Sequence, residues 1–83
     1  MTNIPEQPQN SFRVTLTLST RCRIDGVLLE YLREQTLNPQ LKNISRSAFK
    51  DLFKEKRVQI KGQRAVPSSI LAEGTTYIDI LGF

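Results

Sequence analysis

Hydrophobic and polar residues alternate strictly over residues 12–18. Every second residue there is apolar, and the residues between them are arginine or threonine. A period of two built from branched and aromatic side chains is typical of a strand with one buried face. Shorter stretches of the same alternation occupy residues 58–60 and 77–81, and in the latter Ile78 and Ile80 are expected to point inward. The pattern therefore predicts a strand in each of these three segments.

Two other segments repeat apolar residues at the spacing of a helix. In residues 23–34 the repeat is carried along one side by Ile24, Val27, Leu28, Tyr31 and Leu32. In the second segment Phe49, Leu52 and Phe53 recur at i, i+3 and i+4. Ser45 or Ser47 can cap this helix, because a serine oxygen accepts a hydrogen bond from an unpaired N–H of the first turn. We predict two amphipathic helices, with the two phenylalanines in the core and not on a base-stacking surface.

Proline, glycine and polar residues mark the connections between these elements. Residues 36–43 are predicted to form a polar loop, with Leu37 and Leu41 packed against the core. Lys61-Gly62 is predicted to be a turn.

Residues 65–66 resume an extended segment, and residues 68–74 form a connection anchored by Ile70 and Leu71. Residues 1–11 contain two prolines among polar residues and are expected to be a flexible lead-in. The rest, residues 12–83, forms one α+β domain in the order β-α-α-β-β-β. Two helices on one face of a small, mostly antiparallel sheet is the economical packing for this order.

The composition bounds the class of protein. A chain of 83 residues, 39% hydrophobic and 24% charged, has the balance of a single small globular domain. The sequence shows no signal-peptide pattern, so the cytoplasm is the expected location. Its single cysteine, Cys22, cannot form an internal disulfide, and we expect it to be a half-buried side chain at the start of the first helix.

Positive charge is concentrated in residues 42–64. This segment holds eight basic and two acidic residues, whereas the rest of the chain holds four basic and six acidic ones. At 100° per residue, Arg46, Lys50, Lys54 and Arg57 fall within a sector of about 80° on the second helix. A basic patch on one element is typical of a polyanion binder, although a lysine-rich helix face is also ordinary solvated surface.

Catalytic chemistry is missing from the sequence. There is no histidine, the acidic residues are not clustered at metal-ligand spacing, and phosphate-binding glycine loops and serine nucleophile motifs are absent. We therefore expect neither an enzyme nor a cofactor.

Several ordered pieces of the chain resemble the S4 RNA-binding domain, whose characteristic unit is called the αL motif. Its R-L-D-x-x-L opening is similar to Arg23-Ile24-Asp25 followed by Leu28. Its S-R-S, L-I-x-x-G-x-V-x-V and N-G elements are similar, in order and with close spacing, to residues 44–47, 52–60 and 61–62. Its closing L-x-x-G-D-x-I is similar to residues 71–78. The resemblance covers residues 12–80, and the strand at 12–18 is like the segment before this domain in some pseudouridine synthases.

The resemblance implies two helices and a hairpin that bind structured RNA, typically ribosomal or transfer RNA, including RNA within a ribosomal particle. Carried over to this chain, the RNA contacts fall on the second helix and the hairpin that follows it: Arg46, Ser47, Lys50, Lys54, Lys56, Arg57, Lys61 and Arg64. No membrane contact is implied.

The chain departs from the family pattern at three places. Lys56 stands where the family usually has glycine, Lys61 where it usually has asparagine, and Thr75 where it usually has aspartate. A left-handed backbone at Lys56 would cost on the order of 1–2 kcal/mol for a lysine. Two alternatives to RNA remain open: a protein-interaction module that docks an acidic partner surface, and a DNA-binding domain.

Overall fold

Two eight-residue strands, β1 (Ser11–Leu18) and β6 (Gly74–Leu81), form the longest strand pair in the protein. The structure is a computed structural model that describes residues 6–83. The two strands are antiparallel and in continuous register from Ser11↔Leu81 to Leu18↔Gly74. The alternation predicted for residues 12–18 is confirmed. β6 begins three residues before the predicted segment because β1 is long enough to pair with Gly74 and the two threonines after it.

β3 (Val58–Ile60) and β4 (Gln63–Arg64) complete a four-stranded antiparallel sheet in the order β1-β6-β3-β4. The turn at Lys61-Gly62 is confirmed, and both residues have positive φ, 52° and 81°. A two-residue loop with two positive φ angles is the arrangement of a type I′ hairpin turn, whose twist matches that of the flanking strands. The strand after this turn covers residues 63–64, ahead of the extended segment predicted at residues 65–66.

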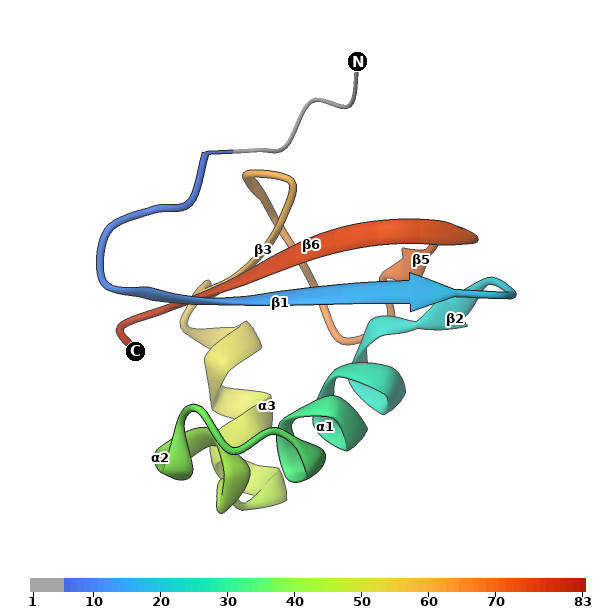
Figure 1. The fold of residues 1–83 in the computed structure, drawn as a ribbon. Helices are drawn as coiled ribbons and strands as arrows, with labels where there is room; N and C mark the ends of the chain where they lie inside the picture. The colour runs from blue at the N-terminus through green and yellow to red at the C-terminus, as the bar shows by residue number, and fades with distance from the viewer. Residues whose placement is uncertain (1–5) are drawn as a thin grey trace.

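α1 (Ile24–Glu34) and α3 (Arg46–Lys54) lie on one side of the sheet, as predicted (Figure 1). Ser45 caps α3, since its Oγ accepts a hydrogen bond from the Ala48 N–H at 3.1 Å. α1 has no side-chain cap, but Asp25 in its first turn complements the positive end of the helix dipole.

The loop predicted at residues 36–43 contains a short helix, α2 (Pro39–Lys42), which corrects the prediction. Asn38 is its cap and accepts a hydrogen bond from the Leu41 N–H at 3.1 Å, while Pro39 suits the first helical position. Asn-Pro therefore begins a helix here, although the same pair also marks turns. Leu41 is buried as expected, but Leu37 is 83% exposed, so its predicted core position is wrong.

A second, two-stranded sheet pairs β2 (Cys22–Arg23) with β5 (Ile70–Leu71), which lies in a segment predicted as a connection. Arg23, predicted as the first residue of the first helix, belongs to β2, and α1 begins at Ile24. Each strand has only two residues, too few for an alternating pattern to show. Leu71 is buried as predicted, whereas half of Ile70 is exposed. Cys22 is half-buried just before α1, as expected.

The core lies between the sheet and the helices. Its buried members are Val14, Leu16, Ile24, Leu28, Leu32, Leu41, Ile44, Phe49, Leu52, Phe53, Val58, Ala65, Leu71, Ile78 and Ile80. The fold is thus the α+β arrangement that was predicted, with one short helix and two short strands added to the predicted order.

The expected flexible lead-in falls partly outside the described residues, at residues 1–5. The remainder is bonded to the end of the chain, since the Asn10 carbonyl accepts hydrogen bonds from the N–H groups of Gly82 and Phe83, at 2.6 and 3.1 Å. The strand also starts one residue before the predicted domain boundary, at Ser11.

Candidate nucleic-acid interface

The C-terminal end of α3 decides which basic residues share a helix face. The helix ends at Lys54, and Lys56 adopts a left-handed conformation with φ of 64°. The Lys56 N–H donates to the Phe53 carbonyl at 3.0 Å, and the Arg57 N–H to the Leu52 carbonyl at 2.8 Å. These two bonds form a Schellman motif, in which the left-handed position is usually glycine. The predicted helical sector is therefore too long, because Arg57 already lies outside the helix.

The remaining three residues, Arg46, Lys50 and Lys54, form what we call the α3 stripe. All three are exposed. Among residues 6–83 none of them takes part in a salt bridge. Phe49 and Phe53 beside them are buried, with ring centroids 5.3 Å apart in an edge-to-face pair. Their predicted place in the core is confirmed.

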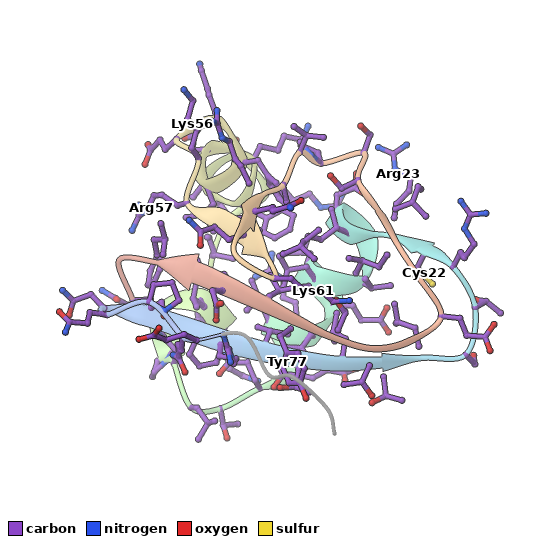
Figure 2. All side chains as sticks on the ribbon, turned by 90° about the horizontal axis from the view of Figure 1, so that it is seen from above. Cys22, Arg23, Lys56, Arg57, Lys61 and Tyr77 are labelled. Atoms are coloured by element: carbon purple, nitrogen blue, oxygen red, sulfur yellow. The ribbon has the colours of Figure 1, made fainter. Side chains whose placement is uncertain are left out.

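Arg57 is bound within the fold. Its Nε donates to the Leu81 carbonyl at 2.9 Å, and its guanidinium carbon lies 4.9 Å from the centre of the Phe83 ring. A longer bond of 3.3 Å joins it to Glu55. The guanidinium occupies the space that a side chain at Gly82 would need. This cation therefore fastens the end of the chain to the start of β3, and Figure 2 shows it beside Lys56.

Three further cations, Lys56, Lys61 and Arg64, lie around the hairpin, and we call them the hairpin cations. All are exposed, and none forms a salt bridge within the described part of the chain. Lys56 and Lys61 flank β3, and five residues of extended chain separate such positions by about 16 Å. Figure 2 labels both, with Cys22 and Arg23 on the other side of the molecule from Lys56.

Ser47 is the remaining predicted contact. It is exposed in the first turn of α3, where backbone N–H groups have no partner within the helix. Since Ser45 provides the cap, the hydroxyl of Ser47 is not needed for that purpose. Its predicted role as a phosphate contact stays a prediction.

A groove of about 640 Å³ separates α1 from α3. Arg46 and Lys50 line its α3 wall, whereas the α1 wall carries Asp25 and Glu30 as well as Arg33. The two carboxylates would repel a phosphate placed deep in the groove. The groove lining therefore mixes three basic and two acidic side chains, and it does not by itself favour a polyanion.

Sequence reasoning missed the buried ion pair between Arg13 and Asp79. Arg13 Nε and a terminal nitrogen donate to the two Asp79 oxygens at 2.8 and 2.9 Å, and the Asp79 side chain is 1% exposed. The hydrogen bond to Asp79 raises the pKa of Arg13, so the arginine stays charged throughout the working pH range. The strand alternation could have placed both residues on the outer face of the sheet, but it does not give the register that sets them opposite one another.

The remaining chemistry of the described residues is sparse. Residues 6–83 contain no group of histidine, cysteine, aspartate or glutamate that could hold a metal ion. None of the helices formed by these residues is long and apolar enough to cross a membrane. No protein-family model, curated protein or solved structure matched the chain. The functional argument therefore rests on the geometry of the cations.

Proposed function

We propose that this protein binds structured RNA, of the ribosomal or transfer type, through the α3 stripe and the hairpin cations. The observation that carries the proposal is that six cations, close together in the sequence, are exposed and lack a salt bridge within residues 6–83. Within the part of the chain that the structure describes, none of these charges is used for an ion pair. A surface that gathers positive charge in this way attracts phosphate groups.

The backbone at two lysines adds support. In the S4 pattern the positions of Lys56 and Lys61 belong to glycine and asparagine, the residues that tolerate a left-handed backbone best. Both lysines have positive φ in this protein, 64° and 52°. The chain therefore has the backbone conformation that the family's residues favour, even where its side chains differ.

The mode of binding follows from the chemistry of the surface. A-form RNA is read mainly through phosphates and 2′-hydroxyl groups, which suits cations that are spread over a helix and a hairpin. The N–H groups at the start of α3, together with Ser47, can receive one phosphate. Lys50 and Lys54 then follow the backbone toward the hairpin cations. Arg57 supports this surface by holding β3 in place, and Phe49 and Phe53 are buried and so do not stack on bases.

The test is a fluorescence-anisotropy titration of a structured ribosomal-type RNA hairpin across a salt series. For about four to six phosphate contacts we expect the logarithm of the association constant to fall with a slope of roughly −3 to −5 against the logarithm of the salt concentration. Changing Arg46, Lys50 and Lys54 together to glutamate should abolish binding, because the α3 stripe would then repel phosphate.

A matched pair of single variants separates a local site from net charge. Lys54→Glu and Arg21→Glu change the charge by the same amount, but Arg21 is an exposed residue in the connection between β1 and β2. We expect Lys54→Glu to lose more affinity by about tenfold or more. Equal losses would mean nonspecific attraction. Absence of binding by the wild type would contradict the proposal and favour an acidic protein partner, whereas preference for a DNA duplex of equal length would favour DNA.

A further inference from the structure

The groove between α1 and α3 has an apolar lining beneath its charged walls. Leu29 comes from α1, Phe49 and Phe53 from α3, and Pro67 from the connection after β4. The volume of about 640 Å³ lies within the range of about 300–1,000 Å³ that is usual for binding sites. A ligand in the groove therefore meets apolar side chains from both helices and from the loop that closes one end.

Gly26 leaves the α1 wall of this groove open at one point. Glycine is disfavoured inside a helix relative to alanine, and Gly26 is the third residue of α1. Its φ is not positive, and a Cβ added to it would meet no other atom of residues 6–83 within 4 Å. Neither crowding nor backbone conformation in this part of the chain requires glycine here. The absent side chain instead allows a ligand in the groove to approach the α1 backbone closely.

The two walls of the groove carry opposite charges. Arg46 and Lys50 are exposed on the α3 wall and Glu30 is exposed on the α1 wall, and none of the three forms a salt bridge within the described part of the chain. Asp25, the other acidic residue of the α1 wall, is bound to Arg23 at 3.1 Å. The lining thus offers a carboxylate on one side and two cations on the other, which suits a ligand that carries both charges.

The two ends of the groove also differ. Arg33, in the last turn of α1, donates to the Lys42 carbonyl at 3.1 Å, and Lys42 Nζ donates to the Arg33 carbonyl at 2.8 Å. These bonds hold Arg33 near the start of α3, where Arg46 is the first residue. Figure 1 shows the end of α1 and the start of α3 on the side away from the sheet. At the other end lies Pro67, whose loop is fixed because the Ser69 carbonyl accepts a hydrogen bond from the first N–H of α1 at 2.9 Å.

We propose that this groove binds an amphipathic helix of another protein. The apolar side chains of that helix, spaced at i, i+3 or i+4 and i+7, lie on the apolar lining. Its basic flank faces Glu30 and its acidic flank faces Arg46 and Lys50. The C-terminal end of a helix carries partial negative charge, so this end lies at Arg33 and Arg46. The bound helix is therefore parallel to α1 and antiparallel to α3. The inference goes beyond the proposed RNA binding and does not depend on it.

A pair of designed peptides of about 14 residues tests the proposal. Both carry leucines at i, i+3 and i+7, lysines on one flank and glutamates on the other, and a staple on the outer face, because so short a helix is marginal in water. They have the same composition but exchange the two flanks, so that only one of them places its lysines beside Glu30. In anisotropy titrations with the full chain we expect that peptide to bind with a Kd of about 10–100 μM and the other about fivefold or more weakly.

Gly26→Leu closes the groove without touching the rest of the fold, because its side chain enters open space. We expect it to weaken the preferred peptide about tenfold or more. The matched control is Thr36→Leu, which adds the same side chain at an exposed position outside the groove and should change nothing. Glu30→Lys should abolish the preference between the two peptides. Circular dichroism verifies that each variant is folded.

The outcomes separate this inference from the proposed RNA binding. Equal binding of the two peptides by the wild type, or no binding of either up to about 1 mM, would overturn the inference. Loss of RNA-hairpin binding in Gly26→Leu would assign the groove to RNA and overturn it as well. A wild type that binds the preferred peptide but no RNA would contradict the proposed function alone.

Discussion

Two groups of cations in this protein differ in how many contacts they make within the fold. Arg13 and Arg57 are bound inside the structure, one to a buried carboxylate and the other to a backbone carbonyl and an aromatic ring. The α3 stripe and the hairpin cations are exposed and form no salt bridge within residues 6–83. Residues of the same type therefore serve the fold in one group and are available to a ligand in the other.

This difference has a direct energetic meaning. A charge that is buried with a partner leaves that partner uncompensated when it is removed. An exposed charge in water contributes little to stability, so its removal changes the free energy of unfolding by only a few tenths of a kcal/mol. Stability and ligand affinity should consequently respond to different arginines and lysines.

The largest loss of stability is expected from Arg13→Ala. Asp79 would be left buried without its partner, which costs about 3 kcal/mol or more. Urea denaturation followed by circular dichroism measures the change. Replacing both residues, as Arg13→Leu with Asp79→Leu, should cost clearly less than the single substitution, because no charge is then left uncompensated. A single-variant loss below about 1 kcal/mol would show that the pair behaves as a surface salt bridge.

A smaller loss is expected from Arg57→Ala. The Leu81 carbonyl loses its donor and Phe83 loses the cation above its ring, which together are worth about 1–2 kcal/mol. The same urea titration measures this effect. Lys50→Ala is the matched control and should leave the midpoint nearly unchanged. If the two variants were equally stable, Arg57 would belong with the exposed cations after all.

The opposite sign is expected at the two left-handed lysines. Lys56→Gly and Lys61→Asn each relieve the backbone at a positive φ and should raise the free energy of unfolding by about 0.5–1 kcal/mol. Both changes also remove a hairpin cation, so RNA affinity should fall as stability rises. Thermal denaturation and the anisotropy titration measure the two effects. A stabilised variant that binds RNA as well as wild type would exclude that lysine from the proposed site.

The sequence predicted secondary structure best in segments where the regular spacing of apolar residues corresponds to a buried face. The alternation in β1 and the helical spacing of Phe49, Leu52 and Phe53 each leave one arrangement that buries the apolar side chains. α2 was missed because four residues are too few to show a period, and an asparagine-proline pair begins turns as well as helices. β2 and β5 were missed because each has only two residues, which is also too few to show a period.

The candidate site was predictable in part. The basic residues of α3 could be placed on one exposed side, because helix geometry fixes their relative directions. Arg57 could not, since its position depends on where the helix ends, and the helix ends at Lys54, ahead of the left-handed Lys56. Nothing local to Arg57 identifies Leu81 or Phe83, which lie more than twenty positions further along the chain, as its partners.

The sequence alone therefore determined the α+β class, the main helices and strands, and the segment in which positive charge is concentrated. These follow from short-range periodicity and composition, which need no knowledge of distant contacts. Only the tertiary structure decided the pairing of Arg13 with Asp79, the binding of Arg57 at the chain end and the register of β1 against β6. Each depends on the register between segments far apart in the sequence, and that register is set by how the whole core packs.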